Sequence, residues 1–195
     1  WLNRYNSSTS DSDEGYEIEI DAAGDVLVLG ETYAFSDTRA FIQKIGGASG
    51  LSIWTRPLTG ISQDQSVMAM ALDLDPQGKI ILTGMLYDGI SYNVDSFIAK
   101  LTPDVAVEWV RSYDGPSDED YDGDPKMVID ADGNIVMALT SEGFANADIQ
   151  VIKYAADGTE QWTYRYGNPF FGDDVMLSWE AEAAQRTLLL DSQGN

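Results

Sequence analysis

Hydrophobic residues in this chain fall in short runs rather than along one face of long helices. The segments YEIEID, VLVLGETY and SFIAKL (residues 16–21, 26–33 and 96–101) are rich in β-branched and aromatic side chains, and they are bounded by turn-forming residues. This pattern is typical of β-strands. No segment sustains a 3.6-residue period, and residues 178–190 come nearest to one. The sequence therefore predicts an all-β chain.

Four of the five tryptophans recur at a nearly constant spacing. Trp1, Trp54, Trp109 and Trp162 are separated by 53, 55 and 53 residues, and an arginine follows each of them two or three positions later. A period near 54 residues that holds four short strands is typical of a β-propeller blade.

Two further landmarks keep the same period. An aspartate stands three positions before a glycine in four segments, which begin at Asp21, Asp75, Asp130 and Asp191. These segments predict hairpin turns, because aspartate accepts backbone N–H bonds there and glycine adopts a positive φ. A lysine near a later strand end also recurs, at Lys44, Lys100 and Lys153. The longer last aspartate interval of 61 residues predicts an insertion before the fourth repeat, although an alternative alignment takes AAQR as the turn.

The period predicts one propeller segment over residues 1–195. Its repeat units are approximately 11–60, 61–116 and 117–170, with a partial unit at 171–195. We expect three whole blades of four antiparallel strands and partial blades at both ends. Open blades leave strand edges uncovered. The chain is thus expected to belong to a larger propeller, or to be covered by a partner subunit; a filament completed between neighbouring subunits is a further alternative.

The segments MVIDADGNIVMALTSEG, ADIQVIKYAADGTEQW and RYGNPFFGDD resemble the repeat of extracellular bacterial β-propellers often labelled seven-bladed (SBBP). Gly50 with Trp54, and Gly158 with Trp162, also resemble the tryptophan-docking motif of quinoprotein-type propellers, in which glycine precedes tryptophan by four residues. The second repeat departs from this motif because it has Val105 in place of glycine. The resemblance implies a propeller scaffold without implying a particular function.

Composition removes several classes of function. Acidic residues outnumber basic ones 33 to 11, which gives a formal charge of −22. Such a surface repels phosphate, so we expect no nucleic-acid binding. The chain has no cysteine and no histidine, which excludes disulfides, thiolate chemistry, the usual zinc sites and histidine-based catalysis. No apolar run approaches the 18 residues of a membrane span.

The acidic stretch SDEDYDGD is the candidate metal site. Asp118, Asp120 and Asp122 match the opening of a calcium loop, and carboxylate oxygens suit this hard cation. Lys126 and Ile129 stand at the ninth and twelfth positions, which excludes an EF-hand. A looser calcium loop, with Ca²⁺ as the possible cofactor, remains an alternative to an acidic connection between blades in which aspartates cap backbone N–H groups.

The remaining candidates each have a structural alternative. The recurring arginines form either an anion-binding ring or ion pairs with neighbouring acidic loops, and the landmark tryptophans either stack on sugars or pack between blades. Asn6 heads an N-S-S sequon and is a candidate glycosylation site. Aromatic residues outside the repeat are candidates for binding in loops; they are Phe170, Phe171 and Trp179.

Together these observations predict a non-catalytic β-propeller scaffold or interaction module of a bacterial surface or secreted protein. We expect protein partners or self-association through blade edges, with a glycan as a further possible ligand. One alternative is a subunit of an extracellular fibre or surface layer that assembles by strand or blade completion. Another is a propeller fragment of a carbohydrate-active or quinone-linked enzyme.

Overall fold

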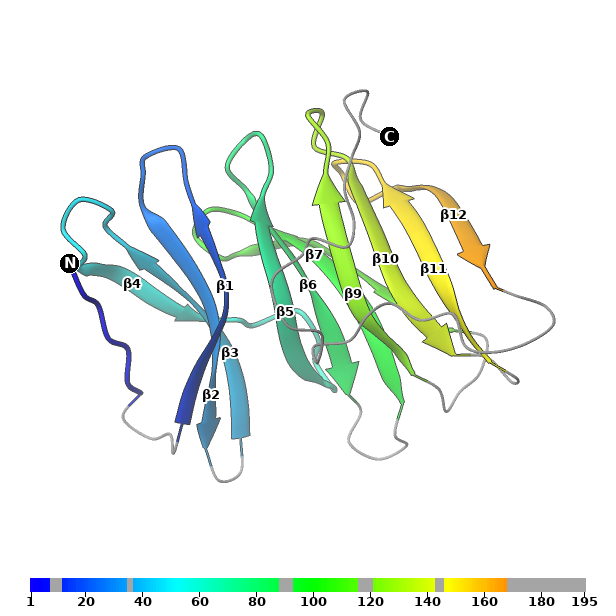
Figure 1. The fold of residues 1–195 in the computed structure, drawn as a ribbon, viewed down its shortest axis with the longest axis horizontal. Coiled ribbons are helices and arrows are strands. Elements are labelled where there is room, and N and C mark those ends of the chain that lie inside the picture. Colours follow the sequence, from blue (N-terminus) through cyan, green and yellow to red (C-terminus); the bar gives the residue numbers. More distant parts are fainter. Residues whose placement is uncertain (8–11, 35–36, 88–92, 116–120, 143–145, 168–195) are drawn as a thin grey trace.

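A computed structural model describes residues 1–7, 12–34, 37–87, 93–115, 121–142 and 146–167. This part of the chain forms three antiparallel sheets, each built from four consecutive strands (Figure 1). It contains no helix with the length and apolar character needed to cross a membrane.

The strands of each sheet follow one another without crossover. The first sheet contains β1 (Ser12–Ile20), β2 (Val26–Ala34), β3 (Asp37–Ile45) and β4 (Ser52–Pro57). The second contains β5 (Ser66–Leu74), β6 (Ile80–Tyr87), β7 (Val94–Leu101) and β8 (Val107–Tyr113). The third contains β9 (Asp122–Ile129), β10 (Ile135–Glu142), β11 (Ala147–Tyr154) and β12 (Glu160–Tyr166).

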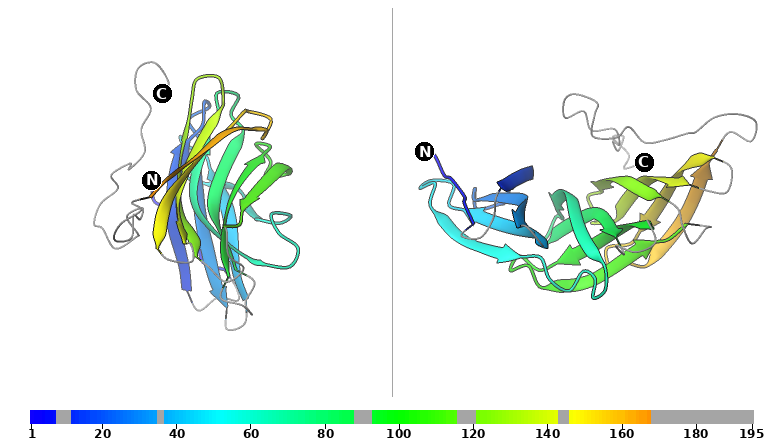
Figure 2. Two further views of the ribbon diagram at one scale, coloured as in Figure 1. Left: turned by 90° about the vertical axis from the view of Figure 1, so that its right-hand side faces the viewer. Right: turned by 90° about the horizontal axis from the view of Figure 1, so that it is seen from below.

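The three sheets stand side by side in a curved row, as the view from below shows (Figure 2). The first strands of the sheets are innermost, because β5 contacts both β1 and β9, whereas β4, β8 and β12 are the outermost strands of their sheets. This arrangement is that of propeller blades, which confirms the predicted fold class. The sheets are called the first, second and third blade below.

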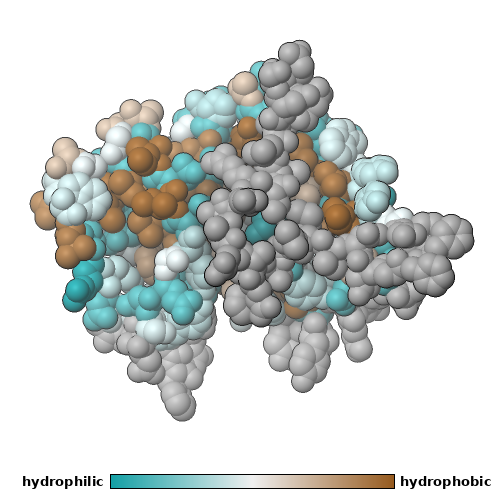
Figure 3. Space-filling model, in the orientation of Figure 1, coloured by the Kyte–Doolittle hydropathy of each residue, from teal (hydrophilic) through white to brown (hydrophobic). Residues whose placement is uncertain are grey.

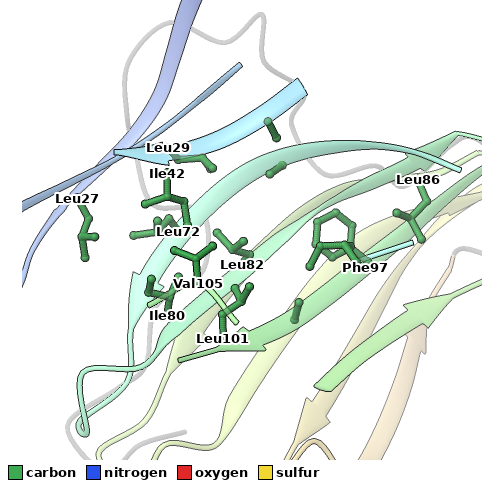
Figure 4. Close-up of a cluster of buried hydrophobic side chains, with 14 residues drawn as sticks. Leu27, Leu29, Ile42, Leu72, Ile80, Leu82, Leu86, Phe97, Leu101 and Val105 are labelled. Carbon is green, nitrogen blue, oxygen red and sulfur yellow. The ribbon is translucent and has the colours of Figure 1, made fainter. Parts of the chain in front are cut away.

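The second blade is buried on both faces. Ile80 and Leu82 of β6 belong to an apolar cluster with the first blade, whereas Ile81 between them belongs to a cluster with the third blade. Figure 4 shows the first cluster, in which Leu27, Leu29 and Ile42 of the first blade lie against side chains of the second. This two-sided burial explains why β6 is mostly apolar instead of alternating and why β7 is buried along its whole length.

The D-x-x-G segments form the β1–β2, β5–β6 and β9–β10 turns, as the sequence predicted. In the second blade, Asp75 Oδ1 accepts the N–H groups of Gln77 and Lys79 at 2.9 and 2.8 Å. Asp21 and Asp130 make the equivalent pairs of bonds in their own turns. The aspartate carboxylate therefore accepts hydrogen bonds from backbone N–H groups that have no strand partner in the tight turn and would otherwise bind water.

The landmark lysines bind these same aspartates, a pairing that the sequence analysis missed. The Nζ–Oδ2 distances are 2.7 Å for Lys44–Asp21, 2.8 Å for Lys100–Asp75 and 3.6 Å for Lys153–Asp130. The second pair is the most buried, with side-chain exposures of 6% and 0%. Lys100 also donates to the carbonyl of Ala156 at 3.1 Å and so connects the second blade to the third.

Burial tends to raise the pKa of Asp75, but the bonds from Lys100 and from two backbone N–H groups outweigh it and hold the pKa below its usual value. A lowered folded-state pKa contributes stability that is present above the unfolded value and is lost as pH falls through the folded value. The ionised Asp75 thus stabilises the fold from neutral pH down into the acid range.

We predict that Lys100→Met lowers the free energy of unfolding by about 3–5 kcal/mol, because it leaves the Asp75 carboxylate buried without its cation. Lys44→Met removes a more exposed pair and is expected to cost about 1 kcal/mol or less. Urea unfolding followed by circular dichroism measures both values. The double variant Lys100→Met/Asp75→Asn should recover much of the loss, and equal costs for the two single variants would contradict this account.

Candidate functional site

A tryptophan from one blade packs on a turn of the next blade. Trp109 of β8 lies on Gly158, in the β11–β12 turn of the third blade, where a Cβ atom would come within 2.7 Å of the indole Cδ2. Arg111 lies over the Trp109 ring at 5.7 Å and donates from Nε to the Gly158 carbonyl at 2.9 Å. We call this arrangement the docking contact. It fixes the outer edge of one blade to its successor.

The first and second blades use the same docking contact with a different turn residue. Trp54 of β4 packs against the apolar cluster that contains Val105, and Arg56 lies 5.0 Å above the Trp54 ring. Val105 has φ +66°, close to the +69° of Gly50 and the +81° of Gly158. The turn thus keeps its left-handed conformation without glycine, although this conformation is costly for a β-branched residue.

The N-terminal segment makes a third docking contact, on the first blade. Trp1 lies against Gly50 in the β3–β4 turn and donates its indole N–H to the Gly47 carbonyl at 2.7 Å. Asn3 Nδ2 donates to the Gly50 carbonyl at 2.8 Å, and the Tyr5 ring lies 4.4 Å from that of Phe41. Residues 1–7 therefore occupy the position of a preceding blade's outer strand.

The fourth tryptophan is not covered in this way. Trp162 of β12 is 45% exposed, and Tyr164 and Tyr166 on the same strand are 60% and 54% exposed. Arg165 does not lie over the indole ring but turns back to its own blade, where Nε binds Asp148 Oδ2 at 2.6 Å. The outer edge of the third blade thus presents an aromatic surface, and this surface is the candidate functional site.

The opposite end of the row is also open. Ile18 and Ile20 of β1 are 61% and 65% exposed, and Leu51 and Ile53 beside the β3–β4 turn are 71% and 53% exposed. The space-filling view shows apolar side chains gathered over this first blade (Figure 3). Each end of the three-blade row therefore carries exposed apolar groups.

A buried carboxylate joins the inner edges of the first two blades. Glu31 of β2 is 2% exposed, and its Oε2 accepts the hydroxyl groups of Tyr16 and Tyr33, each at 3.1 Å. The Ala69 N–H of β5 also donates to this carboxylate. Burial raises the pKa of Glu31 against the opposing effect of the two tyrosine bonds. This buried carboxylate therefore links β1 and β2 of the first blade to β5 of the second.

The acidic stretch is described only in part. Asp118 and Asp120 lie outside the described residues. Asp122 begins β9, is fully buried and accepts the N–H of Gly115 through Oδ2. Within the part of the chain that the structure describes, no three metal-binding side chains of the Asp, Glu, His or Cys type gather at one point. Calcium binding by Asp118, Asp120 and Asp122 stays a prediction.

The other sequence candidates have different outcomes. Arg56 binds Asp104 in the turn of the next blade, and Arg111 and Arg165 bind as described above. Arg56 and Arg165 thus form ion pairs with aspartates, as the structural alternative expected, although neither aspartate lies in a loop that follows a tryptophan. The described bonds of Arg111 go to backbone carbonyls instead. Asn6 is exposed, and its glycosylation stays a prediction. Phe170, Phe171 and Trp179 lie outside the described residues.

Comparisons with known proteins give likeness of structure alone. No protein-family model matches the chain, and no curated protein matches it. An endo-arabinase from Bacteroides thetaiotaomicron is 15% identical with a TM-score of 0.45, over 76% of this chain and 59% of the other. A protein of unknown function from Bacteroides caccae is 8% identical with a TM-score of 0.35, over 83% of this chain and 70% of the other. The chain thus spans less than two thirds of the endo-arabinase.

We predict that Gly158→Ala is more destabilising than Gly24→Ala by about 1–3 kcal/mol. Both glycines have φ +81°, so the backbone cost of a side chain is matched. Only the Gly158 variant places a methyl group against an indole ring, since nothing lies within 4 Å of a Cβ at Gly24. Urea unfolding checks the difference. Equal losses would mean that the docking contact adds nothing to stability.

We predict that Glu31→Gln stabilises the protein at pH 7 by on the order of 1 kcal/mol, because the amide keeps an acceptor for the tyrosines without a buried charge. A raised folded-state pKa means that the stabilising effect of protonated Glu31 is present in acid and is lost as pH rises. The gain should therefore shrink towards pH 4 in thermal melts at several pH values. Glu160→Gln on the exposed β12 is the control, and a loss of stability at pH 7 would refute the prediction.

Proposed function

We propose that this chain is a non-catalytic segment of a β-propeller scaffold that joins further protein through the outer strand of its third blade. The observation that carries the proposal is the fourth docking tryptophan. Trp1 and Trp109 each lie against a turn glycine, and Trp54 packs on the cluster that contains the turn residue Val105. Trp162 is 45% exposed and makes no such contact with a turn in the described part of the chain.

The chemistry of the exposed strand supports a protein partner. Trp162, Tyr164 and Tyr166 offer large, rigid and amphipathic side chains, which are enriched where proteins bind proteins. The groups that suggested small-ligand chemistry are already used within the fold. Arg56 and Arg111 lie over tryptophan rings and bind the adjacent turns, and Arg165 binds Asp148. The landmark lysines bind the aspartates of the hairpins.

The resemblance to extracellular bacterial propeller repeats belongs to the same proposal. It supports a location at a bacterial surface or in a secreted protein, where an excess of acidic residues would keep a repeat scaffold soluble. Any glycan on Asn6 would lie before β1 in sequence, far along the chain from β12.

The proposal requires that β12 is free for a partner, which a pair of matched variants tests. Trp109→Ser should lower the free energy of unfolding by about 2–4 kcal/mol, because the docked indole leaves a cavity on Gly158. Trp162→Ser should change it by no more than about 0.5–1 kcal/mol. Urea unfolding followed by circular dichroism gives both values without relying on the deleted fluorophore. Equal losses would show that Trp162 is already packed and would overturn the proposal.

A further inference from the structure

We propose that the exposed outer strand of the third blade docks onto the first blade of a second copy of this chain, in place of that copy's residues 1–7. The contact would be head to tail and would repeat the joint already present between consecutive blades. This inference rests on the proposed function, since it names the partner of the β12 surface.

The two open ends are the two halves of one interface. Leu72 and Leu74 of the second blade pack in the cluster shared with the first blade. Ile18 and Ile20 stand 54 residues earlier, at the equivalent positions of the first blade, and are exposed. The apolar pair that the second blade buries against the first blade is thus exposed at the equivalent positions of the first blade.

The third blade presents the other half of that interface. Ile81 and Ile98 of the second blade are fully buried in the cluster shared with the third. Their equivalents in the third blade, Val136 and Val151, are only half-buried. Together with Trp162, they form the side of a blade that a following blade covers.

The docking turn of the first blade is the only one in the described part of the chain that no blade strand holds. Trp54 and Trp109 come from β4 and β8. The Gly50 turn is instead contacted by residues 1–7, which form no strand. Trp1 is 66% exposed and Leu2 is 87% exposed in this position. β12 belongs to a four-stranded sheet, so its docking would bring the side chains of that sheet onto the first blade as well.

The sequence of β12 matches that of the segment it would replace. Trp1, Arg4 and Tyr5 have the spacing W-x-x-R-Y, and Trp162, Arg165 and Tyr166 repeat it. Trp54 and Trp109 have their arginines one position closer. Residues 1–7 contact the first blade through this pattern, and β12 of a second copy carries the same pattern.

Head-to-tail contacts generate a closed ring when the rotation between copies closes and an open filament when it does not. A charge of −22 on each copy opposes either assembly. Added salt screens this repulsion. Association is therefore expected to strengthen with ionic strength, as is usual when apolar contacts act against net charge.

The test uses the full chain with its own segment weakened. Trp1→Ser removes the indole from Gly50, and light scattering with size-exclusion chromatography in about 0.5 M NaCl, where the Debye length is a few Å, measures mass against concentration. We expect Trp1→Ser to associate at a concentration about tenfold or more below that of the unmodified chain. Trp1→Ser/Trp162→Ser should stay monomeric. A synthetic peptide of residues 1–7 should suppress association of Trp1→Ser.

Two outcomes would overturn the inference. One is a Trp1→Ser protein that stays monomeric at every concentration while circular dichroism shows it folded. The other is association that Trp162→Ser leaves unchanged, which indicates unspecific aggregation. Ile18→Asp, which places a charge on the exposed apolar surface of the first blade, gives a second block. Should Trp1→Ser fold poorly, Ile18→Asp must abolish the association of the unmodified chain at high concentration. If the copies do not associate but Trp162→Ser leaves the unfolding free energy unchanged, β12 is free for another partner. The proposed function would then stand.

Discussion

A four-stranded blade has two broad faces, and it gains stability when each is buried against another layer. In the described part of this chain, the covering layer is always another blade. The middle blade meets this requirement on both sides, with Ile80 and Leu82 directed to one neighbour and Ile81 to the other. The docking contact closes the outer edge of each joint, and the Glu31 cluster closes the inner edge of the first.

The ion pairs and the hairpin turns serve this packing. A tryptophan can pack on a turn only where the turn is held in one place. Lys100 binds its own hairpin aspartate and also the Ala156 carbonyl near Gly158. It thereby couples two turns of different blades. The chain has only 11 basic residues, and several of them hold the turns and rings at the contacts between blades.

The period of the tryptophans predicted the blades because each landmark performs the same task in every repeat. The sequence did not predict the partner of each landmark. Lys44 and Asp21 are 23 residues apart, and only the strand register brings them together. The spacing of the two landmarks nevertheless contained a signal, since both recur with one period. Glu31 had no such signal, because Met85 and Thr140 stand at its position in the other blades. Val105 shows the reverse case, in which a motif is lost and its backbone geometry is kept.

Each docking contact is shared between two blades, with the tryptophan on one and the turn on the next. No blade therefore contains both halves of its own joint, and every joint has the same polarity along the chain. In a scaffold of this kind, the contact between two blades is the same whatever the number of blades. Duplication or loss of one period leaves every surviving joint with a tryptophan on one side and a turn on the other. Blade number can consequently drift during evolution while the joint itself is preserved.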